Sequence, residues 1–359
     1  MPILNLHTDS ASYPIVIDDF LNNEKAHIQC ASKALLVSNP KVAGLYLHRV
    51  LPKIRAQEVY VCVVPDGEEY KTMQYIDQIL SCAFAHRLDR KSLMIALGGG
   101  VISDMVGFAS GIFERGIDFV SIPTTLLAQV DASVGGKCGI NNMYGKNLVG
   151  LFHQPKAVYI DSTFLATLPL RELKAGLAEM LKIAICFDKE GFEALEKADS
   201  ALLTQNAAAI KAFEPYIYKA IKTKAEVVAQ DERESGIRAG LNYGHTFGHV
   251  IEKITNYTQF LHGEAVAIGM KMANALALKL SLLNTAESKR IDSAFKRFGL
   301  DMTYTIDDVA AFYEQFFLDK KSTQGKITFI LPKGIGQCVI RDDIAKDEVL
   351  NTLAMWQKH

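Results

Sequence analysis

The stretch SLMIALGGGVISD (residues 92–104) is a short apolar run that ends in three glycines and continues into MVGFAS, whose apolar residues have helical spacing. Glycines at a strand-to-helix turn let backbone N–H groups approach a diphosphate, and the positive end of the following helix favours its charge. The stretch therefore predicts a strand, a phosphate-binding turn and a helix. The alternative is a simple tight turn, because Ser103 occupies the last glycine position of the usual G-x-G-x-x-G pattern.

Other apolar runs on both sides of this stretch predict further strands, and residues 72–88 have helical spacing. The predicted strands are KALLVS (33–38), EVYVCVVP (58–65), DFVSIPTT (118–125) and AVYID (157–161). Strands that alternate with helices predict a mostly parallel, Rossmann-like α/β sheet whose ligands gather at the carboxyl ends of the strands.

From about residue 168 onward the pattern is helical over long stretches, with one late apolar run (326–332) that predicts a strand. We therefore expect two domains. Residues 1–168 would form an α/β dinucleotide-binding domain, and residues 169–359 a mainly helical domain that binds metal and substrate.

The composition is that of an ordinary globular protein, with 359 residues, 49% apolar and 22% charged residues. The net charge of −1 gives no global field that favours nucleic acid or an anionic membrane. The N-terminal residues lack a signal-peptide pattern and no membrane span is expected, so we predict a cytoplasmic protein. The six cysteines include no C-x-x-C pair, so any metal would be bound by histidine and carboxylate.

Two further polar loops follow predicted strands. Residues 66–71 (DGEEYK) carry acidic groups suited to ribose hydroxyls, although glutamates in a first helical turn are also favoured by the helix dipole alone. Thr124 and Thr125 follow the strand at 118–123, where one threonine is explained by capping a helix that begins at Leu126.

The segment DASVGGKCGINNMYGKNLVG (131–150) contains Asp131, Lys137, Lys146 and Asn147 among many glycines. Because glycine lowers helix and strand propensity, we expect a loop whose lysines bind phosphate oxygens. The alternative is a solvated loop.

The helical half supplies candidate metal ligands. His245 and His249 are one helical turn apart and share a face, Glu179 lies in LAEMLK, and His262 lies in LHGE. A catalytic zinc needs three protein ligands, which Glu179 and two of the three histidines would provide. A buried or solvated histidine pair is the alternative.

Taken together, these motifs resemble the 3-dehydroquinate synthase family from about Asp66 to Lys321. The resemblance lies in DGEEYK, GGGVISD, RG (115–116), PTTLLAQVDASVGGK, KN (146–147), TLPLRE, AEMLK, KAEVVAQDERESGIRAGLNYGHTFGH, LHGEAV and DKK. It implies Glu179, His245 and His262 as ligands of Zn²⁺, or of Co²⁺ or another divalent ion. His249 is then available for proton transfer or phosphate contact.

The resemblance also implies NAD as cofactor and a phosphorylated sugar acid as substrate. The implied NAD contacts are Asp66, Gly67, Glu68, Lys71, Gly99, Gly100, Val101, Asp104, Thr124, Thr125, Lys146, Phe164, Thr167, Leu168 and Glu172. The implied catalytic residues are Lys137, Asn147, Lys182, Glu234 and His249, and the implied substrate contacts are Arg115, Asp131, Lys224, Arg238, Asn242 and Lys320 or Lys321. Arg115 is expected to reach across a homodimer interface.

The implied reaction converts 3-deoxy-D-arabino-heptulosonate 7-phosphate to 3-dehydroquinate and phosphate, by transient oxidation, phosphate elimination, re-reduction and aldol closure. Arg238 favours this substrate over those of related cyclases, because its planar fork suits a carboxylate that their substrates lack. The alternatives are another sugar phosphate cyclase, a metal-dependent polyol dehydrogenase that releases NADH, and a silent dinucleotide-binding protein.

Three positions depart from the family pattern. Ser103 replaces a glycine, Cys138 stands where threonine is usual, and VSNPKV (37–42), which contains Asn39, lacks the aspartate offered to the adenosine ribose. We expect these departures to tune NAD binding rather than abolish function.

Overall fold

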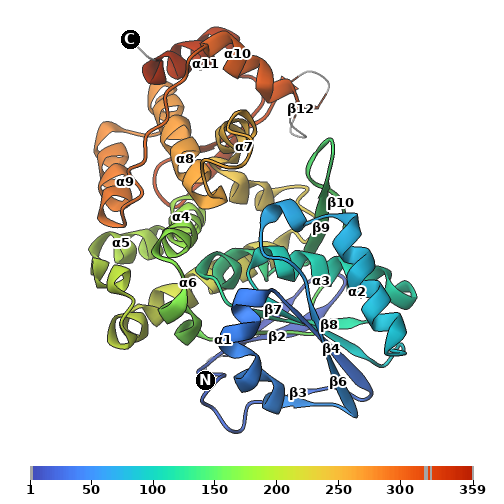
Figure 1. Ribbon diagram of the computed structural model, residues 1–359. Helices are drawn as coiled ribbons and strands as arrows, with labels where there is room; N and C mark the ends of the chain where they lie inside the picture. Colours follow the sequence, from blue (N-terminus) through green and yellow to red (C-terminus); the bar gives the residue numbers. More distant parts are fainter. Residues whose placement is uncertain (1–2, 319–321, 324–325, 358–359) are drawn as a thin grey trace. The chain divides into compact units, whose positions relative to one another are not determined.

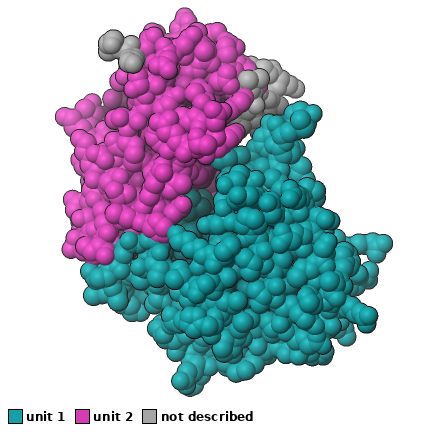
Figure 2. Space-filling view, viewed as in Figure 1, with its two compact units in different colours: residues 1–168, 205–214, 224–233 teal, residues 169–204, 215–223, 234–359 magenta. Residues whose placement is uncertain are grey.

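The computed structural model describes residues 3–318, 322–323 and 326–357, and it divides into two compact units (Figures 1 and 2). Unit 1 consists of Met1–Leu168, Gln205–Glu214 and Lys224–Arg233, and unit 2 of Pro169–Thr204, Pro215–Thr223 and Glu234–His359. Each unit is described by itself below.

Unit 1 is built on a seven-stranded sheet of order β1-β2-β11-β8-β7-β4-β6, parallel except for β1, which pairs antiparallel with β2. Its strands are β1 (Ile3–His7), β2 (Ser12–Ile17), β4 (Lys33–Ser38), β6 (Glu58–Val63), β7 (Leu93–Gly98), β8 (Asp118–Pro123) and β11 (Ala157–Ile160). Its helices include α1 (Pro40–Val50), α2 (Met73–Ala85) and α3 (Gly100–Ile112). This confirms the predicted mostly parallel sheet and five of its strands.

The central strands have helices on both faces, which explains their unbroken apolar runs. Along β4, Leu35 and Val37 pack in a cluster with residues of α2 and α3, whereas Leu36 packs in a second cluster with Tyr46 and Val50 of α1. Alternate side chains of a strand point to opposite faces, so one apolar run supplies two cores.

The segment predicted as a glycine loop is instead a hairpin, and that prediction is wrong. β9 (Lys137–Asn142) pairs antiparallel with β10 (Gly145–Phe152). A Cβ on Gly150 would lie 2.3 Å from the carbonyl oxygen of Cys138, so glycine here permits close pairing of the two strands. The ladder and the packing of β9 against α3 override the low strand propensity.

Unit 2 is mainly helical, as predicted from the long helical patterns. Its helices are α4 (Leu170–Phe187), α5 (Lys189–Lys197), α7 (His245–Ile254), α8 (His262–Lys279), α9 (Thr285–Arg297), α10 (Val309–Gln315) and α11 (Lys346–Leu353). The long helix α6 (Ala207–Gln230) contributes residues to both units. The late strand predicted at 326–332 is present as β13 (Lys326–Ile327) and β14 (Phe329–Pro332), and β14 pairs with β15 (Cys338–Arg341).

Short segments complete the chain. They are β3 (Ile28–Gln29), β5 (Ile54–Arg55), β12 (Ser322–Thr323), the π-helical η4 (Ala128–Ala132), and the 3-10 helices η1 (Leu51–Lys53), η2 (Glu68–Tyr70), η3 (Phe113–Arg115), η5 (Ser162–Thr167), η6 (Ser200–Thr204), η7 (Ile237–Asn242), η8 (Phe316–Leu318) and η9 (Ala354–Trp356). In the part of the chain that the structure describes, none of the helices has the length and apolar character needed to cross a membrane.

Candidate active site

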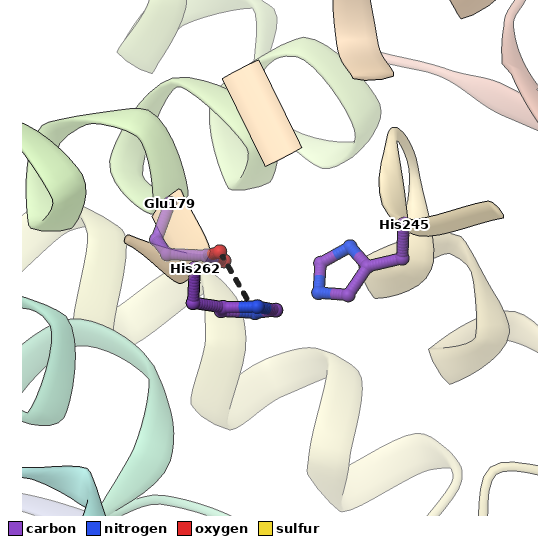
Figure 3. Close-up of side chains that lie close together, drawn as sticks. All are labelled: Glu179, His245 and His262. Carbon is purple, nitrogen blue, oxygen red and sulfur yellow. Dashed lines mark ion pairs between the residues drawn. The ribbon is translucent and has the colours of Figure 1, made fainter. Parts of the chain in front are cut away.

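Three candidate metal ligands converge in unit 2. Glu179 comes from the middle of α4, and His245 and His262 are the first residues of α7 and α8. One ligand atom from each lies within 4.8 Å of the other two, and His262 Nε2 is 3.8 Å from Glu179 Oε1 (Figure 3). Glu179 is fully buried and His245 is buried. The three side chains therefore form a compact cluster of one carboxylate and two imidazoles.

Glycines allow the three helices to approach closely enough to form this cluster. A Cβ on Gly263, next to His262, would lie 2.2 Å from the carbonyl oxygen of Ala175 on α4. A Cβ on Gly269 of α8 would lie 2.1 Å from the carbonyl oxygen of Gly244, just before α7. Real Cβ atoms do not approach backbone this closely, so α8 packs against α4 and α7 only because these positions have no side chain.

An ion pair fixes the start of α8. Glu264 accepts a 2.8 Å hydrogen bond from the backbone N–H of Leu261, which closes the first turn of the helix. Arg171 of α4 donates to both carboxylate oxygens of Glu264, at 2.7 and 2.6 Å. The first residue of α8, His262, is thus held by contacts on the same helix that carries Glu179.

A backbone carbonyl orients His245. Its Nδ1 lies 3.3 Å from the carbonyl oxygen of Tyr243, so Nδ1–H donates there and Nε2 keeps its lone pair. Gly244, at φ +83°, makes the left-handed turn that starts α7 at His245. The centroid of the His249 ring lies 5.4 Å from that of the His245 ring, so a third imidazole borders the cluster.

Unit 2 also contains the predicted lysine, arginine and asparagine residues Lys182, Arg238 and Asn242. Lys182, one turn after Glu179 on α4, is 1% exposed and forms an ion pair with that carboxylate. Arg238 is buried in η7, and Asn242 at the end of η7 donates to Glu234. Opposite charge beside a carboxyl group favours its ionised form, and the ionised form is the one that binds a metal.

In unit 1, the predicted cofactor loops meet at one edge of the sheet. β4 is bonded to both β6 and β7, and the chain moves from β6 across β4 to β7, so the direction of strand order reverses there. The carboxyl ends of parallel strands at such a reversal are the usual dinucleotide position. Asp66 to Lys71 follow β6, Gly99 to Asp104 follow β7, and Thr124 and Thr125 follow β8.

The glycine turn leads directly into α3. Gly99 is the N-cap residue of this helix and Gly100 its first residue. A Cβ on Gly99 would lie 3.0 Å from the Cγ2 of Thr125, so a side chain would crowd the turn. Thr125 Oγ1 accepts a hydrogen bond from the N–H of Ala128, which confirms the predicted cap.

Lys71 connects several predicted site residues. Its ammonium group is 2.5 Å from Asp104 of α3 and donates to the amide oxygen of Asn147 on β10 at 2.6 Å. Burial alone would lower the pKa of Lys71, but the charges of Asp104 and Glu68 outweigh it and raise that pKa. The lysine therefore stays charged and ties the loop after β6 to α3 and the hairpin.

The three departures from the family pattern have local partners. Asn39 caps α1 by accepting from the N–H of Val42, and its amide donates to Asp66. Ser103 Oγ is 3.1 Å from Ser121 Oγ, and Cys138 Sγ lies 2.2 Å from where a Cβ on Gly107 would be. Ser103 and Cys138 thus pack into the protein around α3, whereas Asn39 stays at the edge of the sheet.

The remaining predicted residues lie in several places. Phe164 and Thr167 are in η5, where Phe164 packs in the core against Tyr46 and Thr167 hydrogen-bonds the Tyr46 hydroxyl. Lys224 pairs with Asp131 within unit 1. The others are Lys137 and Arg115 (both exposed), Lys146 on β10, Leu168 after η5 and Glu172 in the first turn of α4. Lys320 and Lys321 lie outside the described residues.

Comparison with known protein families shows to which family the chain belongs. The family model for the 3-dehydroquinate synthase N-terminal part matches residues 61–175, and the model for the C-terminal part matches residues 176–322. The chain belongs to the 3-dehydroquinate synthase family.

Individual members of the 3-dehydroquinate synthase family match over nearly the whole chain. A 3-dehydroquinate synthase of Helicobacter hepaticus is 58% identical, covering 99% of this chain and 98% of its own length. One of Wolinella succinogenes is 57% identical, covering 98% and 99%. A solved 2-epi-5-epi-valiolone synthase of Streptomyces hygroscopicus, with NAD⁺ and Zn²⁺ bound, is 29% identical with a TM-score of 0.86, covering 98% of each chain.

Two residues of the cluster region are not among those predicted from the sequence. Arg171 holds the start of α8, and Glu252 on α7 lies beside His262. Glu252 follows His245 by seven residues, a spacing that puts both on one face of a helix, so helical periodicity was a usable signal. Arg171 gives no such signal, because its partner lies 93 positions away.

Proposed function

We propose that the chain converts 3-deoxy-D-arabino-heptulosonate 7-phosphate to 3-dehydroquinate and phosphate, using NAD⁺ and a divalent cation. The observation that carries the proposal is the convergence of Glu179, His245 and His262 in a member of the 3-dehydroquinate synthase family. The following paragraphs assign the roles of individual residues within it.

The donor set of the cluster fits a catalytic divalent cation. One carboxylate and two imidazoles are ligands that suit Zn²⁺ and Co²⁺, and three protein ligands leave a position open for a substrate hydroxyl. Glu179, His245 and His262 would hold this cation. The relative solved with Zn²⁺ supports the same choice of metal.

The carboxyl edge of the unit 1 sheet fits NAD⁺. Gly99, Gly100 and Val101 present backbone N–H groups at the start of a 13-residue helix, which suits a diphosphate. Asp66 and Glu68 provide carboxylates for ribose hydroxyls. In this proposal, residues 1–168 bind the dinucleotide, and residues 169–359 bind the metal and make most of the contacts with the substrate.

NAD⁺ bound at this edge would supply a reversible hydride acceptor, and a cation held by Glu179, His245 and His262 would supply a Lewis acid for a substrate hydroxyl. Arg238 would bind the substrate carboxylate through its planar guanidinium group. Lys137, Asn147 and His249 would contact the phosphate, with Lys320 or Lys321. Lys182, beside Glu179, would contact a substrate hydroxyl and stabilise negative charge that develops on it.

His249 and Glu234 are the candidates for proton transfer. His249 is partly exposed beside the cluster, and histidine changes charge near neutral pH. Glu234 accepts from Asn242 and has a left-handed backbone at φ +60°, which is costly and is often found at functional sites. Asp131, Lys224 and Asn242 complete the substrate-facing set.

A homodimer and a cytoplasmic location are further parts of the proposal. Arg115 is exposed, and both Arg115 and Glu114 have positive φ, at +69° and +52°. This strained turn directs an arginine outward, as expected for a side chain that reaches a second copy. Sedimentation of the wild type and of Arg115→Ala, together with their activities, would test this part.

The test is an assay with NAD⁺, Zn²⁺ and the heptulosonate phosphate. We expect release of inorganic phosphate and formation of 3-dehydroquinate without net NADH, and loss of both after treatment with a chelator. Steady accumulation of NADH absorbance without phosphate release would instead support the polyol dehydrogenase alternative. Phosphate release that persists unchanged without any divalent cation would contradict the assigned role of the cluster.

A further inference from the structure

Glu252 is a buried carboxylate to which the proposed reaction gives no role. It lies on α7, seven residues after His245 and three after His249, and only 1% of its surface is exposed. Removing a carboxylate from water is costly unless nearby groups compensate its charge. Its carboxylate lies beside His262, one of the three proposed ligands.

The imidazole of His262 lies between two buried carboxylates. Its Nδ1 is 3.4 Å from both Oε1 and Oε2 of Glu252, whereas its Nε2 is 3.8 Å from Oε1 of Glu179. A neutral imidazole has one N–H donor and one lone pair. The shorter contact and its two acceptor oxygens favour the proton on Nδ1, so that the Nε2 lone pair faces Glu179.

The same arrangement is present at the second histidine of the cluster. His245 Nδ1 lies 3.3 Å from the carbonyl oxygen of Tyr243. Both imidazoles thus have an acceptor at Nδ1, a backbone carbonyl for His245 and a carboxylate for His262. An acceptor at one ring nitrogen fixes the tautomer and makes the other nitrogen more basic, which strengthens metal binding.

We propose that Glu252 is a positioning residue that accepts the Nδ1–H of His262 and directs Nε2 toward the cation held with Glu179 and His245. This role rests on the proposed metal cluster. The negative charge of Glu252 also offsets part of the positive charge of a bound divalent cation. Glu252 therefore acts on the metal through His262 and not by contact with it.

The structure also contains the competing arrangement, in which Glu252 is itself a ligand. Potential ligand atoms of His249, Glu252 and His262 lie within 4.8 Å of one another. A neutral His262 has only one lone pair, so it can bind a metal in only one of the two clusters. To bind a metal beside Glu252, Nδ1 would have to give up the proton that it donates to Glu252 in the first arrangement. The two arrangements predict different spectra for a bound transition metal.

The experiment compares the metal-free wild type with Glu252→Ala, Glu252→Gln and two controls. His262→Ala removes a proposed ligand, and Glu232→Gln changes another buried glutamate, in unit 1, which is hydrogen-bonded to Ser10 and Gln154. Zn²⁺ affinity is measured by competition with a chromophoric chelator, and folding by the thermal melt of the metal-free protein.

We expect Glu252→Ala to weaken Zn²⁺ binding about 10- to 100-fold, as is usual when such an orienting partner is removed. Glu252→Gln keeps an acceptor oxygen for Nδ1–H but loses the charge, so a smaller loss is expected. Glu232→Gln should bind Zn²⁺ as the wild type does. Affinities of both Glu252 variants within about twofold of the wild type would overturn the proposal.

The visible spectrum of bound Co²⁺ separates a positioning residue from a ligand. If Glu252 only orients His262, Glu252→Gln keeps the same donor atoms and the absorption bands keep their positions. For this measurement Glu179→Gln is added as the reference for a changed ligand. Bands of Glu252→Gln that shift as far as those of Glu179→Gln would make Glu252 a ligand and overturn the positioning role. Because Gln preserves size and a hydrogen-bond acceptor, this comparison holds even where the alanine variant fails to fold.

These outcomes are distinguishable from failure of the proposed cluster. If His262→Ala binds Zn²⁺ as tightly as the wild type, the ligand assignment fails, and the role of Glu252 fails with it. If His262→Ala loses the metal but both Glu252 variants keep it, the cluster stands and only the positioning role is overturned.

Discussion

Lys224 and Asp131, 93 positions apart in the sequence, form an ion pair in which the Lys224 ammonium also donates to the backbone carbonyl of Asp131. The lysine comes from α6 and the aspartate from η4, both within unit 1. Lys224 is 4% exposed, so the pair is largely shielded from water. The pair fixes the segment that leads from β8 to the β9–β10 hairpin.

Asp131→Asn should therefore destabilise unit 1. The substitution removes the carboxylate charge that faces a buried ammonium, although the backbone carbonyl stays available, and we expect a loss of about 1–3 kcal/mol in the free energy of unfolding. Urea denaturation measures it. The control is Asp118→Asn, whose partner Lys156 is 60% exposed, and there a change below about 0.5 kcal/mol is expected. Equal effects at both sites would contradict the role of the buried pair.

Gly263→Ala should loosen the packing that holds His262 near Glu179. The new methyl group would meet the backbone of Ala175, which cannot rotate away as a side chain can, so α8 must shift from α4. We expect a loss of about 1–3 kcal/mol and at least about tenfold weaker Zn²⁺ binding, as expected for displacement of a ligand.

The matched control for this change is Gly44→Ala on α1, where nothing lies within 4 Å of the added methyl group. Because alanine favours helix over glycine, this variant should be as stable as the wild type or more stable by about 0.4–1 kcal/mol. Thermal melts and chelator competition give both quantities. A Gly263→Ala protein with wild-type metal affinity would mean that helix spacing does not set the cluster.

Arg238→Lys should impair binding of the carboxylate substrate even though lysine keeps the positive charge at this position. A lysine cannot form two parallel hydrogen bonds to a carboxylate, so we expect kcat/KM to fall about tenfold or more. Steady-state phosphate release is the measurement, with the exposed Arg55→Lys as control. Unchanged kinetics would assign Arg238 to structure.

The Glu196–Arg290 pair should make stability depend on acid pH. Arg290 donates to Glu196 at 2.7 and 2.9 Å, and this lowers the pKa of the carboxyl below its usual value of 4.5. A lowered pKa stabilises the fold above the usual value, and that contribution is lost as pH falls through the pKa of the folded protein. Since the pair is partly exposed, its contribution is at most about 1 kcal/mol.

Urea midpoints at pH 7 and at pH 3 test this. Glu196→Gln should be less stable than the wild type at pH 7, and the difference should shrink at pH 3. Glu190→Gln, at a 90% exposed side chain, should show little difference at either pH. A difference for Glu196→Gln that is the same at both values would show that the charge is not its cause.

Much of the fold follows from local patterns. The strands β4, β6, β7, β8 and β11 are short apolar runs bounded by turns, and α2, α4, α6 and α8 follow from helical spacing. β1 and β2 were not predicted, because neither is an unbroken apolar run. β1 is the edge strand, β2 pairs with β1 and β11, and in both strands buried residues are separated by exposed or part-exposed ones. The segment that forms the β9–β10 hairpin is predicted as a loop, because the low strand propensity of glycine takes no account of the close contact between two paired backbones.

The sequence alone determined the residue types of the cluster and the family resemblance, because ordered motifs such as NYGHTFGH and LHGE are local strings. Only the tertiary structure decided which side chains meet. The contact of Glu179 with His262, the clamp of Arg171 on Glu264 and the position of Glu252 at Nδ1 of His262 all depend on how closely α4, α7 and α8 pack. That spacing is set by steric contact between residues distant in the chain, which a one-dimensional pattern does not contain.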